Sequence, residues 1–209
     1  MAPPDQQRDA PVERLVLDLG GVVLTSAMPR IVAELAGTSG RSEQSLWRYF
    51  NERLFHPFWS GAMDVQTFWA EFTAHAGVPG AEGRWERELV PSMLRLRLPA
   101  ERVRRWAARV PVGVLSNQRA EWVRPVLERE GLLDLLGPVF ISSETGLLKP
   151  AHEAFAQLTA LGTPADRILY VDDRPQAVRA AGELGIAAIQ ADPDGAWADR
   201  VDERLGTAP

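Results

Sequence analysis

The stretch ILYVDDRPQAVRAAGELGIAAIQ, residues 168–190, decides the fold. It opens with a short apolar run, typical of a buried parallel strand, which ends in Asp172 and is followed by Asp173. Pro175 then begins a helical pattern that stops at Gly185, and a second apolar run follows at 186–190. Strand, helix and strand in this order predict a parallel β–α–β unit with two acids at the carboxyl end of its first strand.

The same kind of apolar run recurs earlier in the chain, at 15–19, 112–116 and 139–142. Helical patterns at 119–130 and 151–161 follow the second and third runs, and a glycine ends each of them. Pro125 inside the first of these patterns predicts a kink or a break. Together the runs predict an α/β fold with a doubly wound parallel sheet, whose ligand site lies beyond the carboxyl ends of the strands.

Residues 28–97 interrupt this alternation with helical patterns at 29–36, 42–54, 64–76 and 81–94. Asp64 is a good N-cap and Gly77 a good stop for the third pattern. We therefore expect a flexible tail at 1–11, a core at 12–27 and 98–209, and an α-helical insert at 28–97. The residues expected in the core of the insert are Trp47, Phe50, Phe58, Trp59 and Trp69.

The composition excludes several classes of protein. The chain has 209 residues, 45% of them apolar and 24% charged, and a net charge of −5 with scattered arginines, so we expect no nucleic-acid partner. No apolar run approaches the roughly 20 residues of a membrane span, and no signal pattern begins the chain, so we expect a cytoplasmic protein without a membrane partner. The absence of cysteine excludes thiolate metal sites and cysteine nucleophiles.

Polar residues gather where the expected strands end. In chain order they are Asp18, Gly20, Gly21, Ser116, Asn117, Lys149, Asp172 and Asp173. Because the carboxyl ends of parallel strands share one edge of the sheet, we expect these residues to meet there, with free backbone N–H groups in the glycine turn. Three carboxylates without cysteine or histidine suit Mg²⁺, and such a set fits phosphoryl transfer to an aspartate.

Lys149 is the only lysine among 23 basic residues, the other 22 being arginines. An ammonium on a flexible stem acts as a compact point charge, whereas a guanidinium is a broad planar fork. The single lysine therefore predicts a site that needs a small cation beside the phosphate.

The segments LVLDLGGVVLT (15–25), VGVLSNQ (112–118), GLLKPAHEAF (146–155) and ILYVDDRPQAVRAAGELGI (168–186) resemble, in order, the four motifs of the haloacid dehalogenase (HAD) superfamily of hydrolases. The helical insert sits where members carry a C1-type cap. The resemblance implies a Rossmann-like core and an Mg²⁺-dependent phosphatase that acts on a small phosphorylated metabolite, such as a sugar phosphate, through an aspartyl-phosphate.

The resemblance also implies roles for individual residues. Asp18 is the expected nucleophile and a metal ligand, and the other expected ligands are the Gly20 carbonyl, Asp172 and Asp173. Ser116 and Lys149 are expected to hold the phosphate, with Asn117 and Gly21 also in contact with the substrate.

Gly20 departs from the pattern of most phosphatases in this superfamily, which have a second aspartate at that position. That acid protonates the leaving oxygen, and such catalysis is typically worth about 10²–10⁴-fold. Its loss favours an ester with a good leaving group, such as an anomeric sugar, acyl or aryl phosphate. The form DLGGV (18–22) with a C1 cap also resembles the branch that holds bacterial glucose-1-phosphate phosphatases and the phosphatase domain of soluble epoxide hydrolases.

Two other functions stay open. A hydrolytic 2-haloacid dehalogenase releases a halide that needs no proton, but it needs no metal either, whereas Asp172 and Asp173 predict one. A non-catalytic phosphate-binding or regulatory protein would follow if Gly20 marks a decayed site. Arg119, Arg174 and the three histidines are interpreted as surface residues, and the sequence leaves the oligomeric state and the natural substrate open.

Overall fold

The computed structural model of the protein describes residues 10–80, 83 and 85–207. Most of the expected tail, residues 1–9, lies outside the described residues, as do residues 81, 82 and 84 of the helix expected at 81–94. The division of the chain into tail, core and insert stays a prediction.

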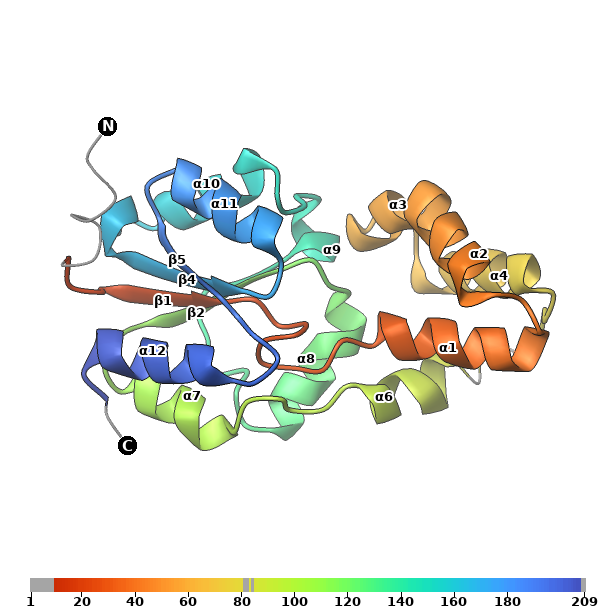
Figure 1. Cartoon of the computed structure of the whole chain (residues 1–209), viewed down its shortest axis with the longest axis horizontal. Coiled ribbons are helices and arrows are strands. Elements are labelled where there is room, and N and C mark those ends of the chain that lie inside the picture. Colours follow the sequence, from red (N-terminus) through yellow and green to blue (C-terminus); the bar gives the residue numbers. More distant parts are fainter. Residues whose placement is uncertain (1–9, 81–82, 84, 208–209) are drawn as a thin grey trace.

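A five-stranded parallel sheet lies at the centre of the protein (Figure 1). Its strands are β1 (Arg14–Leu17), β2 (Val112–Ser116), β3 (Val139–Ile141), β4 (Ile168–Asp172) and β5 (Ala187–Gln190). They pair in the order β3-β2-β1-β4-β5, and each pair is parallel. The predicted fold class is confirmed, and every expected strand is present.

Helices cover both faces of the sheet (Figure 1). On one face pack α7 (Ala100–Ala107), α8 (Ala120–Arg129) and α12 (Ala196–Leu205), and on the other α10 (His152–Thr159) and α11 (Pro175–Glu183). Successive side chains of a strand point to opposite faces. Accordingly Leu15 packs in the cluster of Trp106 and Trp197, whereas Val16 packs in that of Phe155. Two short helices, α9 (Ser142–Thr145) and η4 (Ala165–Arg167), flank α10 in the chain.

Helix α8 runs unbroken through Pro125, so the break expected there is absent. A proline inside a helix removes one backbone hydrogen bond and crowds the preceding turn, at a cost of about 3 kcal/mol. The side chains of Trp122, Val123, Val126 and Leu127 are buried on either side of it. Their burial offsets the local cost and keeps the helix continuous.

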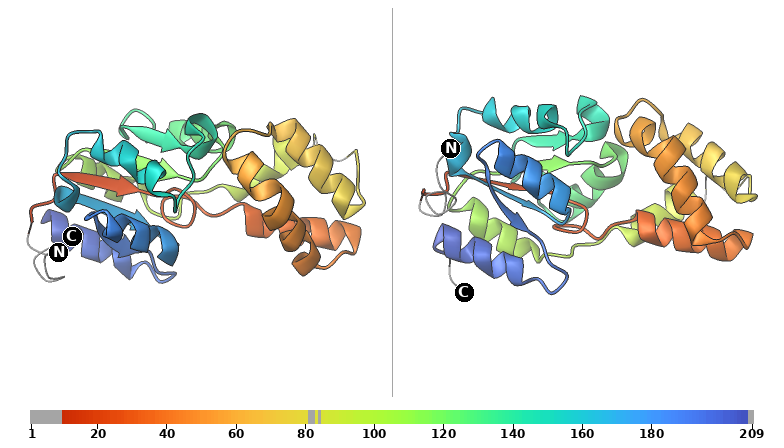
Figure 2. Two further views of the ribbon diagram at one scale, coloured as in Figure 1. Left: turned by 90° about the horizontal axis from the view of Figure 1, so that it is seen from above. Right: turned by 45° about the horizontal axis from the view of Figure 1, so that its top comes forward.

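The helical insert lies between β1 and α7 in the chain and stands beyond the carboxyl ends of the strands (Figures 1 and 2). It contains α1 (Met28–Ser39), α2 (Glu43–Tyr49), the π-helical η2 (Phe50–Leu54), α3 (Phe55–Trp59), α4 (Val65–Ala76), the π-helical η3 (Trp85–Leu89) and α6 (Val90–Met93). The predicted ends of α4 are confirmed, because the Asp64 side chain accepts a hydrogen bond from Thr67 N–H and Gly77 takes a left-handed conformation.

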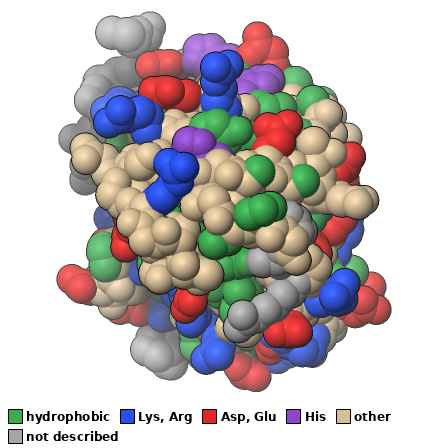
Figure 3. Space-filling model, turned by 90° about the vertical axis from the view of Figure 1, so that its right-hand side faces the viewer, with side chains coloured by type: hydrophobic (Ala, Val, Ile, Leu, Met, Phe, Trp, Pro, Cys, Tyr) green, Lys and Arg blue, Asp and Glu red, His purple; other side chains and the backbone are tan. Residues whose placement is uncertain are grey.

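The outer end of the insert carries acidic and basic side chains intermingled, without a broad area of one sign (Figure 3). Within the described part of the chain, no helix combines the length and the apolar character needed to cross a lipid bilayer.

The insert packs on the rest of the protein through the end of α3 and the turn that follows. The Phe58 and Trp59 rings lie 5.2 and 5.8 Å, between centroids, from the Trp122 ring of α8. The Ser142 hydroxyl donates a 2.6 Å hydrogen bond to the Trp59 carbonyl. Gly61 has a φ of +80°, and a Cβ there would lie 2.1 Å from the Ser143 carbonyl oxygen. Only glycine permits this close approach.

Replacing Gly61 with alanine should destabilise the protein more than the same change at Gly77. Both residues have a positive φ, which costs alanine about 1–2 kcal/mol, but nothing lies within 4 Å of a Cβ at Gly77. We expect Gly61→Ala to lower the free energy of unfolding in urea by at least about 1 kcal/mol more than Gly77→Ala, because only Gly61→Ala adds a backbone clash. Equal losses would contradict the packing described for this turn.

Candidate functional site

Three aspartates meet beyond the carboxyl ends of β1 and β4. Asp18 directly follows β1, and its N–H donates to the Val171 carbonyl of the neighbouring β4 at 2.9 Å. Asp172 ends β4 and Asp173 follows it. One carboxylate oxygen of each aspartate lies within 4.8 Å of those of the other two. Three negative groups this close repel one another unless cations balance them.

The ammonium of Lys149 supplies one such cation. Its Nζ lies 2.9 Å from Asp18 Oδ1 and 2.5 Å from Asp172 Oδ2, and it donates to the Tyr170 hydroxyl at 2.8 Å. The side chain is 4% exposed. These three contacts use all three N–H donors of the ammonium. Lys149 is therefore a buried charge held from three directions.

Tyr170 belongs to the site although sequence analysis missed it. Its hydroxyl donates to Asp172 Oδ2, the same oxygen that Lys149 contacts. Residues two apart on a strand share a face, so the position of Tyr170 before Asp172 was the available signal.

The end of β2 positions both Asp18 and Lys149. The Ser116 hydroxyl donates to Asp18 Oδ1 at 2.6 Å and accepts from Leu19 N–H. The Asn117 amide pairs with the backbone of Lys149, donating to its carbonyl at 2.8 Å and accepting from its N–H at 2.9 Å. Asn117 thus fixes the loop that carries the lysine.

The turn after Asp18 differs from expectation at Gly21. Its N–H donates to the Leu24 carbonyl at 2.7 Å, so the free backbone donor expected there is absent because the turn closes on itself. Its φ is +82°, and a Cβ would lie 2.3 Å from Asp173 Oδ2. The structure thus requires glycine at this position to let Asp173 approach the turn. Gly20 lines the cavity beside Asp18.

The charges shift the pKa values of the aspartates in different directions. Burial raises the pKa of Asp18, although the Lys149 ammonium opposes the shift. Burial acts in the same sense on Asp172, but its ion pair and hydrogen bond with Lys149 and the hydrogen bond from Tyr170 outweigh it, so that its pKa is lowered.

Asp173 has the least favourable surroundings of the three. Burial, followed by the carboxylates of Asp18 and Asp172, raises its pKa to about 6. Its Oδ1 is buried and has no hydrogen-bond partner within the described part of the chain. A buried, unpartnered carboxylate oxygen beside two other carboxylates is an arrangement that a divalent cation would complete, and a set of hard oxygen donors fits Mg²⁺.

Two adjoining cavities open onto the aspartates. A small cavity of about 40 Å³ is lined by Asp18, Gly20 and Lys149, among others. A larger one of about 490 Å³ lies between the insert and the strand ends, with aromatic residues from the insert along it: Trp47, Phe50, Phe55 and Trp59. The residues that line both cavities are Ser26, Asn117, Gln118, Asp173 and Arg174.

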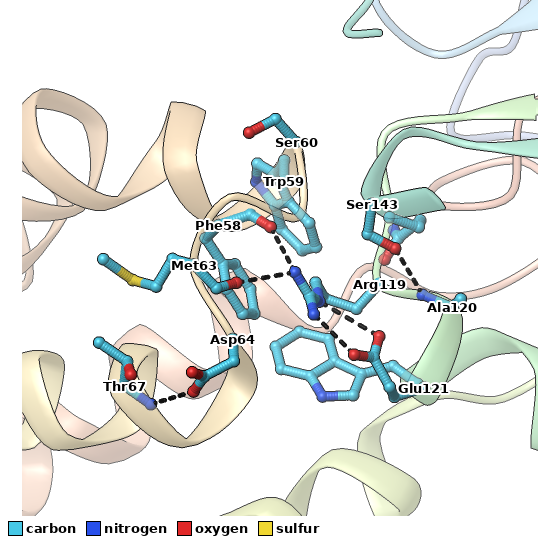
Figure 4. Close-up of polar contacts among 12 residues, drawn as sticks. Phe58, Trp59, Ser60, Met63, Asp64, Thr67, Arg119, Ala120, Glu121 and Ser143 are labelled. Carbon is cyan, nitrogen blue, oxygen red and sulfur yellow. Dashed lines mark hydrogen bonds and ion pairs between the residues drawn. The ribbon is translucent and has the colours of Figure 1, made fainter. Parts of the chain in front are cut away.

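The expectation of a surface position for Arg119 is wrong, because the residue is only 4% exposed. Its guanidinium donates to the carbonyls of Phe58 at 2.8 Å and Met63 at 3.0 Å, and it pairs with Glu121 at 2.6 Å (Figure 4). It also lies 5.1 Å from the centre of the Phe58 ring. Arg119 therefore ties the insert to the segment that follows β2.

The remaining residues left out of the expected site are more exposed. Arg174 is exposed but lines both cavities. His56 and His152 are exposed, as expected, whereas His75, in the last turn of α4, is half-buried and stacks on the Tyr49 ring. Of the aromatic residues expected in the core of the insert, all but Trp47 are buried.

Removing the charge at Lys149 should destabilise the protein strongly. Lys149→Met keeps most of the length of the side chain but leaves Asp18 and Asp172 without their cation, for which we expect a loss of about 3–5 kcal/mol in the free energy of unfolding. Lys149→Arg keeps the charge and should lose less, although a planar fork cannot meet three partners placed around one nitrogen. Urea denaturation in EDTA measures both. A loss below about 1 kcal/mol for Lys149→Met, as for an exposed ion pair, would contradict the role of Lys149 as the cation of two buried carboxylates.

Comparison with known proteins gives a match in structure alone, since no family model and no curated protein matches the chain. A HAD family enzyme from Bacteroides thetaiotaomicron superposes with a TM-score of 0.78 at 18% identity, over 92% of this chain and 99% of that one. A predicted HAD-like family hydrolase from Porphyromonas gingivalis gives 0.72 at 21% identity, over 94% and 98%.

Two further structures carry information on ligands or activity. The Bacteroides enzyme in complex with magnesium and inorganic phosphate gives a TM-score of 0.72 at 19% identity, over 87% of this chain and 94% of that one. A dehalogenase gives 0.66 at 18% identity, over 88% and 86%. The parallel sheet, its helical layers and the helices beyond the strand ends therefore form the fold seen in HAD family structures.

Proposed function

We propose that the protein is an Mg²⁺-dependent phosphatase that hydrolyses a small phosphorylated metabolite through an aspartyl-phosphate on Asp18. The observation that carries the proposal is the meeting of Asp18, Asp173 and Lys149 around one small cavity. The complex of the Bacteroides enzyme with magnesium and inorganic phosphate supports it, because that enzyme has the same fold.

Asp18 is the nucleophile in this proposal. Ser116 and Lys149 both bind its Oδ1, so we assign the attack on phosphorus to Oδ2. The ester P–O bond breaks as the Asp18–phosphorus bond forms, and water later hydrolyses the acyl phosphate. Lys149 opposes the effect of burial on the pKa of Asp18 and so favours the ionised carboxylate that the attack requires.

Asp18, Asp173 and the Gly20 carbonyl would hold the metal. Bound there, Mg²⁺ would neutralise part of the charge that gathers on the phosphate and the nucleophile. Asp172 has protein partners on both oxygens, because Oδ1 accepts from Arg174 N–H and Oδ2 from Lys149. We therefore assign Asp172 to the orientation of Lys149 and to contact with the waters of the metal.

Ser116 and Lys149 border the nucleophile, and we assign both to the phosphate of the bound substrate, for which each would exchange its hydrogen bond to Asp18 Oδ1 for one to a phosphate oxygen. We assign Asn117 the positioning of the Lys149 loop, since its amide pairs with that backbone. Gly21 would act by admitting Asp173 to the turn rather than by binding the substrate.

The helical insert, residues 28–97, would act as the cap over the site. It lines the larger cavity with aromatic rings, opposite the polar groups of Gln176 and Arg174. A cavity of about 490 Å³ suits a small molecule, and aromatic faces with polar partners suit a sugar or an aryl ring. The cap would exclude water while the phosphoryl group is transferred.

A dehalogenase is the less favoured alternative. The likeness to a solved dehalogenase is one of fold, and a dehalogenase gives no role to the buried, unpartnered oxygen of Asp173. A metal-dependent phosphatase gives it one.

The purified protein should hydrolyse p-nitrophenyl phosphate with Mg²⁺, and Asp18→Asn should lower kcat by about 10³-fold or more, as expected for loss of a nucleophile. Asp166→Asn is the matched control, because Asp166 is exposed in η4. Release of p-nitrophenolate measures both.

Activity unchanged in Asp18→Asn would refute the mechanism. Chloride release from a 2-haloacid that EDTA does not diminish would instead establish the dehalogenase. Phosphate binding without turnover of any ester would establish the non-catalytic alternative.

Asp173→Asn should remove the effect of Mg²⁺ on the stability of the protein, which can be measured independently of its activity. At an Mg²⁺ concentration of 100 times Kd, the wild-type protein should gain about 2.7 kcal/mol, and Asp173→Asn should gain little. In EDTA at pH 7 the order should reverse, because the variant lacks a partly buried negative charge that burial and the neighbouring carboxylates of Asp18 and Asp172 disfavour. Thermal unfolding with and without Mg²⁺ measures both effects. An equal gain in the wild type and the variant would place the metal elsewhere.

A further inference from the structure

We infer that the side-chain amide of Gln118 donates a hydrogen bond to the leaving oxygen of the substrate, from the space where relatives carry an acid. The protein would thus stabilise a departing oxyanion instead of protonating it. This inference rests on the phosphatase function proposed above and adds a catalytic residue to it.

The first observation is that Gln118 fills the room beside Gly20. A Cβ built on Gly20 would lie 2.7 Å from Gln118 Nε2 and 3.6 Å from Ser26 Oγ. Gly20 is not among the glycines with a positive φ, so its backbone accepts a side chain. The first group that a side chain at position 20 would meet is the amide of Gln118, which lies at the end of a flexible side chain and would have to move aside. The glycine and the glutamine are therefore complementary in space.

The second observation is the place of Gln118 between the two cavities. It lines the small cavity with Asp18 and Lys149, and also the larger cavity with the aromatic rings of the insert. An ester with its phosphorus facing Asp18 and its organic group in the larger cavity must pass its bridging oxygen through this junction. All five residues that line both cavities are polar, and Gln118 is the one whose amide lies beside Gly20.

The third observation concerns how Gln118 is held. The residue is 9% exposed, its N–H donates to the Ser142 hydroxyl at 3.1 Å, and its carbonyl accepts from Ser143 N–H at 3.3 Å. Its side-chain amide makes no hydrogen bond to another described residue, so its two N–H donors are available to a ligand. Arg174, which shares the junction, is exposed, whereas Gln118 is largely buried.

The chemistry of an amide determines what it contributes. When the P–O bond breaks, its electron pair stays on the leaving oxygen, and an amide donates a hydrogen bond to that oxygen without giving up a proton. The proton then comes from solvent. Hydrogen bonds to an anion are stronger than those to a neutral ester oxygen, so the contribution falls mainly on the transition state. It grows as the leaving group becomes more basic and carries more charge.

The test is a series of aryl phosphates from p-nitrophenyl to phenyl phosphate, measured with the full-length protein and Mg²⁺. Gln118→Met keeps the length of the side chain but removes the donor. We expect it to lower kcat/KM by about 10- to 100-fold, with the larger loss for phenyl phosphate. The matched variant Gln176→Met changes the same group at a residue that lines only the larger cavity. It should change kcat/KM by the same factor for every ester.

The outcomes separate the two proposals. In one outcome, the wild type turns over the esters, Asp18→Asn abolishes that turnover, and Gln118→Met lowers kcat/KM equally for every ester. This outcome would overturn the role of Gln118 and leave the proposed phosphatase function intact. No wild-type turnover of any aryl phosphate would overturn both. Thermal unfolding of each variant shows that it is folded before its rates are compared.

A second measurement tests the shared space. Gly20→Asp should raise the turnover of phenyl phosphate at least about 10-fold more in a Gln118→Ala background than in the wild type, because in the wild type the new acid must first displace the Gln118 amide. An equal gain in both backgrounds would show that the amide does not occupy the place of the acid, and would overturn the inference.

Discussion

The contact between the Lys149 ammonium and the carboxylates of Asp18 and Asp172 is the interaction on which the site depends. All three side chains are at most 9% exposed, and ionised groups so far from water are costly unless they are paired. The lysine reaches them from the loop after α9, whereas Asp18 directly follows the central strand β1 and Asp172 ends the neighbouring strand β4. The Lys149 ammonium thus links the loop that carries it to the ends of strands β1 and β4 at a single point.

The fold and the meeting of the main site residues could be predicted because both follow from local patterns and one rule of topology. Short apolar runs mark buried parallel strands, and the ends of parallel strands share an edge. Asp18, Asp172 and Lys149 therefore had to converge once the strands were placed. The closed turn at Gly21 was not predictable in the same way, since whether its N–H is free depends on how the following residues fold back onto Leu24.

Residues whose roles depend on distant contacts escaped prediction. Arg119 is one of 22 arginines, and nothing around it indicates burial, because its carbonyl partner in Phe58 lies 61 residues away in the chain. Pro125 breaks a helix by local rules, but the packing of α8 on the sheet overrides them. The relation of Gln118 to Gly20 joins positions almost a hundred residues apart, and it depends on how closely the fold brings the glutamine amide to the glycine.

Gln118 and Arg119 are neighbours in the chain. Gln118 lines the junction of the two cavities, whereas Arg119 donates hydrogen bonds to the carbonyls of Phe58 and Met63 in the insert. A movement of the insert that broke the Arg119 hydrogen bonds would therefore also shift the backbone that positions the Gln118 amide. Under the proposed mechanism, leaving-group assistance would then be greatest when the insert is seated. A phosphate too small to contact the insert would then be turned over more slowly than one that fills the larger cavity.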